Sequence, residues 1–177
     1  DSIYLKHYAR IYGMAIYRSK TLKEIQMYYS ALSFVTDTES VVRLNYLKQF
    51  GITDDDIELM PVFHENQNYI DFMVGVSENG ELPEILMAIM PCMLSYCYIF
   101  KKIAAKPTAR SSRYWDFISD YADEHFDEIC LNWQAYADSL CDSLPAEKKD
   151  KLCAIFEKGS LLELDFWKMA YRGTANE

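Results

Sequence analysis

The chain has 177 residues, of which 50% are hydrophobic and 25% charged, and its formal net charge is −9. This length and apolar content are enough for a single domain with a buried core, expected over residues 1–177. The acidic balance argues against a nucleic-acid partner, because binding to phosphates requires a basic protein face.

The first segment, residues 1–20, predicts a helix with an aromatic stripe. Tyr4, Tyr8 and Tyr12 recur at helical spacing on one face. Asp1 lies one turn before Tyr4 on the same face, where a carboxylate and a phenol could together bind a polar ligand. An aspartate is also a residue that favours the start of a helix, and the spacing alone favours this structural role.

Residues 21–50 predict one or two further helices. Thr21 with Glu24 three positions later matches a capping box, in which each side chain bonds the backbone of the other residue. Gly51 is placed to end this helical segment, as a C-terminal glycine commonly does. Thr53 then begins a short helix whose first turn is acidic.

A long apolar stretch at residues 84–100 is predicted to be the central buried helix. It follows an amphipathic helix at residues 64–78, in which Tyr69 occupies the apolar side. Pro91 interrupts the apolar stretch, where a proline removes one backbone hydrogen bond and favours a kink. Cys92 follows directly. It is either a small buried hydrophobe or a nucleophile that lines a pocket opened by the kink.

The C-terminal third predicts amphipathic helices at residues 111–127 and 128–143 and a long last helix at residues 145–171. Within the last helix, Glu163 shares a face with Phe166. A carboxylate on an apolar face must find partners or take up a proton, because burial disfavours its charged form. The pattern leaves open whether Glu163 is functional or exposed.

Other motifs narrow the class of site. The five cysteines contain no CxxC pair, which indicates reduced thiols in a cytoplasmic protein and neither a disulfide framework nor a zinc site. The longest apolar run is broken by Pro91 and is expected to fall short of a membrane span. No histidine follows a glutamate by three residues, as carboxylate di-metal bundles require. Strand-like alternation is missing, so the predicted fold class is all-α.

Four segments together carry a family resemblance: residues 1–5 (DSIYL), 84–92 (EILMAIMPC), 117–121 (FISDY) and 163–172 (ELDFWKMAYR). They resemble the TenA, or thiaminase II, family of aminopyrimidine aminohydrolases. The resemblance implies an all-α, haem-oxygenase-like multi-helix bundle, and the family helix that precedes Asp1 is expected to be absent from this sequence. It also implies a homotetramer that needs no metal or organic cofactor.

The resemblance places the family's active site position by position. Its residues fall on Asp1, Tyr4, Tyr69, Cys92, Tyr121 and Glu163, with Phe166 where an aromatic side chain commonly walls the pocket. Leu94 and His125 depart from the family pattern near these positions. These two departures bear on which substrate is preferred and on how the pocket closes, more than on the reaction that the active-site residues carry out.

The implied activity is hydrolysis of the exocyclic C–N bond of 4-amino-5-aminomethyl-2-methylpyrimidine, or of thiamin, to give the hydroxymethylpyrimidine of thiamin salvage. The resemblance implies Cys92 as nucleophile and Glu163 as general acid and base. Asp1 is expected to bind the amino group and a ring nitrogen, and Tyr4 and Phe166 to stack on the ring. The sequence does not decide between the two substrates. The alternative is a non-catalytic aminopyrimidine- or thiamin-binding protein, or a regulator, of the same fold.

Overall fold

The structure, a computed structural model, describes residues 1–173, with the side chains of residues 38–41 outside that description. Residues 174–177 of the predicted domain also lie outside it. The described residues form helices and no strand, which confirms the all-α prediction. In chain order the helices are α1 (Ser2–Arg18), α2 (Leu22–Ser33), the π-helix η1 (Phe34–Thr38), α3 (Glu39–Gln49), α4 (Asp54–Leu59), α5 (His64–Asn79), α6 (Leu82–Ala104), the 3₁₀-helix η2 (Ala109–Ser111), α7 (Trp115–Ala122), α8 (Glu124–Cys141) and α9 (Ala146–Gly173).

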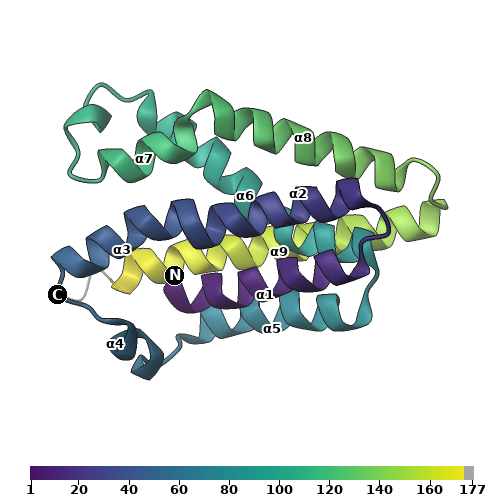
Figure 1. The fold of residues 1–177 in the computed structure, drawn as a ribbon, viewed down its shortest axis with the longest axis horizontal. Coiled ribbons are helices and arrows are strands. Elements are labelled where there is room, and N and C mark those ends of the chain that lie inside the picture. The colour runs from purple at the N-terminus through teal and green to yellow at the C-terminus, as the bar shows by residue number, and fades with distance from the viewer. Residues whose placement is uncertain (174–177) are drawn as a thin grey trace.

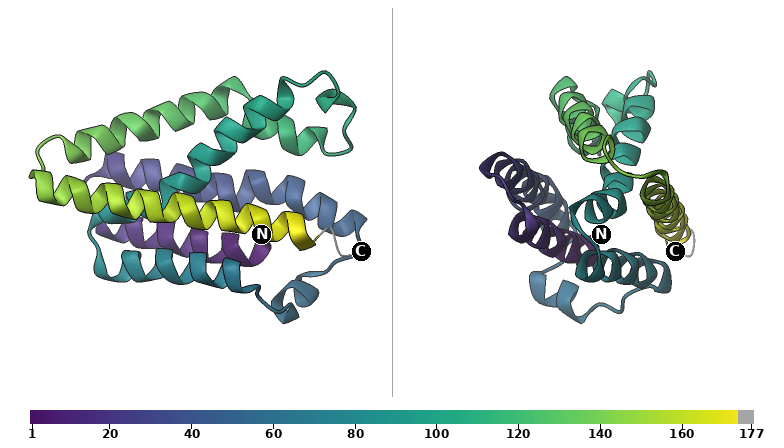
Figure 2. Two further views of the ribbon diagram at one scale, coloured as in Figure 1. Left: turned by 180° about the vertical axis from the view of Figure 1, so that it is seen from behind. Right: turned by 90° about the vertical axis from the view of Figure 1, so that its right-hand side faces the viewer.

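Helix α6 is the centre of the bundle, as its apolar sequence predicts. It contacts α1, α5, α7, α8 and α9 (Figure 1). The right-hand view of Figure 2 looks along the bundle and shows α6 surrounded by the helices α1, α2, α5, α8 and α9. The fold therefore brings residues from both halves of the chain onto one helix.

Helix α6 continues through Pro91, and it extends beyond the predicted residues 84–100 at both ends, to Leu82 and Ala104. By length and composition alone, α6 could cross a membrane, contrary to the expectation that the proline leaves too short a run. Its neighbours account for the apolar residues in another way, since side chains such as Ile85, Leu86 and Ile89 are fully or almost fully buried against them. Helix α6 is the core helix of this bundle.

Local sequence signals explain most helix ends. Thr21 and Glu24 form the predicted capping box at the start of α2, and Thr53 and Asp56 form another at the start of α4. Gly51 has a φ of 71°, a left-handed conformation that glycine adopts without steric cost. These predicted boundaries are confirmed.

One predicted boundary is wrong. The helical segment of residues 111–127 breaks at Asp123, so that α7 ends at Ala122 and α8 begins at Glu124. Asp123 is extended, and its carboxylate accepts a hydrogen bond from the backbone N–H of His125 at 2.7 Å. An aspartate in this role satisfies a backbone donor that the first turn of a helix leaves unpaired.

Candidate active site

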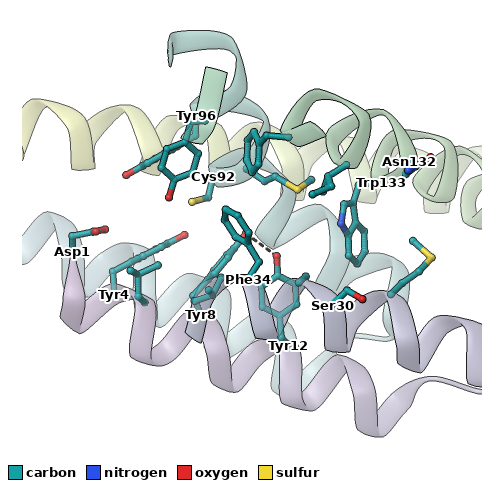
Figure 3. A pocket seen from close by; sticks show the side chains of 18 residues that line it. Asp1, Tyr4, Tyr8, Tyr12, Ser30, Phe34, Cys92, Tyr96, Asn132 and Trp133 are labelled. Carbon is teal, nitrogen blue, oxygen red and sulfur yellow. Dashed lines mark hydrogen bonds between the residues drawn. The ribbon is translucent and has the colours of Figure 1, made fainter. Parts of the chain in front are cut away.

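A cavity of about 230 Å³ lies between α1, α2 and η1 on one side and α6, α7 and α8 on the other (Figure 3). Eight of the 18 residues that line it are aromatic: Tyr4, Tyr8, Tyr12, Phe34, Tyr96, Tyr121, Phe126 and Trp133. The few polar groups include Asp1 at one end and the Cys92 thiol in the wall. Such a cavity suits a flat, largely uncharged ring with a few polar substituents.

The tyrosine stripe of α1 forms one wall of the cavity. The rings of Tyr4 and Tyr8 stack with their centroids 5.4 Å apart. The Tyr8 hydroxyl donates to the carbonyl oxygen of Ile89 at 2.8 Å. The Tyr12 hydroxyl donates to the hydroxyl oxygen of Tyr8 at 3.3 Å. Because both hydroxyls have protein partners, Tyr8 and Tyr12 are held in place as fixed walls.

Cys92 is half-buried and follows Pro91 on α6. The pKa of Tyr4 is raised well above its usual value, mainly by burial and next by the Cys92 thiol. This thiol therefore lies near a buried phenol. Burial, Glu163 and Cys92, in that order, also raise the pKa of Tyr69 well above its usual value. Both phenols therefore stay protonated at neutral pH and can donate hydrogen bonds beside the thiol.

Glu163 on α9 is buried, with only 3% of its surface exposed. Burial raises the pKa of its carboxyl to about 7, although hydrogen bonding from Trp167, Tyr69 and Ser95 opposes this shift. The indole Nε1–H of Trp167 donates to Glu163 Oε1 at 2.8 Å. The hydroxyl of Tyr69 lies beside Glu163, but no described residue gives it a hydrogen bond of normal geometry.

The sequence-predicted site residues fall into two groups. One group lines the cavity: Asp1, Tyr4, Cys92 and Tyr121. The other lies outside the lining: Tyr69, Glu163 and Phe166. The rings of Tyr69 and Phe166 contact Tyr4, with centroids 5.1 and 5.5 Å from its own. The second group therefore supports the cavity wall and places an ionisable carboxyl next to it.

Comparison with known proteins identifies the family of this chain. Residues 1–173 match the sequence model of the TENA/THI-4/PQQC family. The chain belongs to this family. It is 28% identical over 172 residues to an aminopyrimidine aminohydrolase of Halalkalibacterium halodurans, covering 97% of this chain and 77% of that protein. It is 24% identical to another from Helicobacter pylori, covering 97% and 80%.

Solved structures agree with the family assignment. A TenA family transcription regulator from a Silicibacter species superposes with a TM-score of 0.82 at 25% identity, covering 94% of this chain and 76% of that one. A TenA homologue from Pyrococcus horikoshii gives a TM-score of 0.82 at 24% identity, covering 96% and 78%. The predicted TenA fold is thus confirmed.

Neither departure from the TenA pattern lines the cavity. Leu94 is partly buried and packs between the two apolar clusters of the core. His125 is exposed at the start of α8, and the neighbouring Phe126 is the residue that reaches the cavity wall. Leu94 therefore belongs to the core and His125 to the surface.

Sequence reasoning missed several wall residues of this TenA-family site. Phe34, Tyr96 and Trp133 come from three separate helices, and Tyr96 packs edge-on against Tyr121 with centroids 4.9 Å apart. Each looks like an ordinary core aromatic in the sequence. Tyr8, by contrast, was detectable, because it continues the stripe that begins at Tyr4.

Among residues 1–173, no group of three or more histidine, cysteine or acidic side chains is placed to hold a metal ion. The cysteines, all within residues 1–173, form no disulfide, and Cys92 is the one that lines the cavity. The arrangement offers a thiol, a carboxylate, several phenols and a nearby buried carboxyl. These groups can bind an aromatic ring, add a nucleophile to it and move protons.

Proposed function

We propose that the protein is a hydrolase of thiamin salvage that cleaves the exocyclic C–N bond of 4-amino-5-aminomethyl-2-methylpyrimidine. The products are ammonia and 4-amino-5-hydroxymethyl-2-methylpyrimidine. The observation that carries the proposal is the Cys92 thiol in the wall of an aromatic cavity, together with the buried Glu163 carboxyl, whose pKa is about 7 and which acts on the same phenols, Tyr4 and Tyr69, as Cys92 does. Relatives described as aminopyrimidine aminohydrolases support it.

Ring binding uses the polar and aromatic walls. The Asp1 carboxylate accepts hydrogen bonds from the 4-amino group and from a protonated ring nitrogen, and the charge-assisted pair orients the ring. Tyr4 stacks on one face, supported from behind by Phe166. Tyr121, buried among aromatic side chains, directs its ring toward the cavity and bonds a ring nitrogen.

The chemistry begins at the thiol. Cys92 Sγ adds as thiolate to the ring carbon next to the one that carries the exocyclic methylene, and the electron pair moves into the ring. The resulting enamine expels the amine, which takes up a proton and leaves as ammonia. Water adds to the exocyclic methylene and loses a proton. The C–S bond then breaks, which restores the aromatic ring and the free thiol.

Glu163 supplies the proton transfers. A carboxyl whose pKa lies near neutral pH can both accept the thiol proton and donate one to the leaving amine. Glu163 and Cys92 both raise the pKa of Tyr69, and we assign the Tyr69 hydroxyl to proton exchange between the two groups. Without such help, a free thiol of ordinary pKa is only a few per cent ionised at neutral pH.

Incubation of the purified protein with the aminomethylpyrimidine, followed by ammonia assay and mass analysis of the pyrimidine, tests the proposal. Stoichiometric ammonia and hydroxymethylpyrimidine are expected. A parallel incubation with thiamin compares the two substrates. Thermal stabilisation by the pyrimidine without any product would refute the hydrolase and favour the binding protein or regulator.

We further propose that the protein is a homotetramer of the cytoplasm. The TenA family resemblance supports the assembly, and the free cysteines fit a reducing compartment. Light scattering coupled to size-exclusion chromatography measures the assembly directly. A monomeric mass at micromolar concentration would contradict it.

A further inference from the structure

The buried carboxyl of Glu163 has one donor whose direction is fixed by packing. We propose that Trp167 is a positioning residue for the reaction: its indole N–H holds Glu163 Oε1, so that Oε2 is the oxygen that takes up and releases the proton. This inference rests on the proposed function. It assigns a role to a side chain outside the cavity lining.

The position of the indole follows from two helices. Trp167 lies one turn after Glu163 on α9, where side chains four residues apart meet. Its Nε1–H reaches Oε1 at 2.8 Å. The ring packs on Tyr96 and Phe100 of α6, with centroid distances of 5.2 and 6.1 Å. Because α6 fixes the ring, it also fixes the direction of the N–H.

Among the hydrogen-bond donors of Glu163, Trp167 differs from Tyr69 and Ser95 in the kind of group that donates. An indole N–H only donates, whereas the hydroxyls of Tyr69 and Ser95 can rotate and either donate or accept. Ser95 already donates to the carbonyl oxygen of Cys92 at 2.9 Å. A carboxyl keeps one accepting oxygen in both protonation states, so the Trp167 bond persists while the proton comes and goes at the other oxygen.

The side chains that hydrogen-bond to the Glu163 carboxyl, Trp167, Tyr69 and Ser95, are all neutral. Tyr4 on α1 and Tyr69 on α5 are titratable groups that interact with this carboxyl, and Cys92 on α6 acts on the same two phenols. Burial is the largest influence on the carboxyl and opposes its ionised form. The indole is therefore a principal stabiliser of the carboxylate.

Trp167→Phe tests the role, because it removes the N–H and keeps an aromatic ring on α6. We expect kcat to fall about tenfold with little change in KM, since the base is displaced and ring binding is untouched. The acidic limb of the pH–rate profile should move up by about one pH unit, as the carboxylate loses a donor. Carboxyl-carbon NMR of Glu163 should show the same displacement.

Trp115→Phe is the matched control, since Trp115 lies on α7 outside the cavity lining and its ring is covered by Arg110. It should leave both the rate and the Glu163 titration unchanged. In the Glu163→Gln background, Trp167→Phe should cause no further loss of rate. An equal loss in both backgrounds would show a packing role and overturn the proposal.

The NMR titration does not require turnover, so it tests the positioning role of Trp167 separately from the proposed hydrolase function. An unmoved Glu163 titration in Trp167→Phe overturns the positioning role even if the wild type is an active hydrolase. A moved titration in a protein that releases no ammonia supports the Trp167–Glu163 contact and refutes the proposed function.

Discussion

At the scale of single residues, burial decides what Glu163 can do. The sequence places this carboxylate on an apolar face but does not say whether that face is covered. In the structure it is covered, and the carboxyl pKa rises to about 7. A glutamate of ordinary pKa would be a weak proton donor at neutral pH, whereas this one can exchange a proton in both directions.

Glu163→Gln should lower turnover by about 10²- to 10⁴-fold, because the amide keeps the shape of the side chain but cannot move a proton. Binding of the hydroxymethylpyrimidine product should change little, since Glu163 lies outside the cavity lining. Steady-state kinetics and calorimetric titration measure the two effects. Unchanged turnover would remove Glu163 from the mechanism.

The raised pKa also predicts a pH dependence of stability. Below about pH 4.5 the carboxyl is protonated in both folded and unfolded chains, and the native state carries no penalty from Glu163. Between pH 4.5 and about 7 the unfolded chain loses this proton first, so stability falls with rising pH. The loss amounts to about 3 kcal/mol.

Denaturant unfolding of the wild type and Glu163→Gln across this pH range measures that loss. The glutamine variant cannot titrate at this position, so the stability of the wild type relative to it should decrease from acidic to neutral pH. A difference that stays constant with pH would mean that the Glu163 pKa is close to its usual value.

At the scale of helices, Gly159 sets how α9 meets the central helix. A Cβ at this position would lie 2.9 Å from Cγ of Pro91 and 3.5 Å from the carbonyl oxygen of Ala88. A glycine inside a helix weakens it, yet α9 continues through Gly159. The glycine instead permits close packing against Pro91, the residue before Cys92, because it has no side chain to separate the helices.

Gly159→Ala should therefore destabilise the protein by about 1–3 kcal/mol through overpacking against α6. Gly13→Ala is the matched control, because Gly13 is also helical and a Cβ there meets no atom within 4 Å. That variant should gain about 0.5–1 kcal/mol, since alanine favours a helix over glycine. Chemical denaturation compares them, and equal effects of the two changes would exclude the packing role.

Local patterns predicted the helices well where the signal is contained in a few residues. The stripe of Tyr4 and Tyr8 and the capping box of Thr21 and Glu24 each lie within one or a few turns, and the structure has both. The break at Asp123 was missed. An amphipathic pattern can run through a single capping residue without interruption, so periodicity alone does not reveal the change of direction.

At the scale of the whole molecule, the cavity depends on contacts between distant parts of the chain. Its walls come from α1, α2, η1, α6, α7 and α8. In Figure 3, Tyr4 and Tyr8 face Cys92 and Tyr96 across the cavity. The family resemblance identified residues that the structure gathers near Cys92, but it did not distinguish the lining from the support behind it. Whether a residue of α5 or α9 lines the cavity or lies behind its wall depends on whether Tyr4 covers it. This covering is set by how the helices pack, which the sequence pattern does not reveal.

The central claim is that Cys92 is the nucleophile of a hydrolase. The most direct measurement is the rate of ammonia release from the aminomethylpyrimidine by the wild type, Cys92→Ser and the control Cys153→Ser, whose cysteine is exposed on α9. The account predicts release by the wild type and by the control, and a loss of at least about 10²-fold in Cys92→Ser. Equal release by all three proteins would mean that the Cys92 thiol only fills space, and would contradict the mechanism.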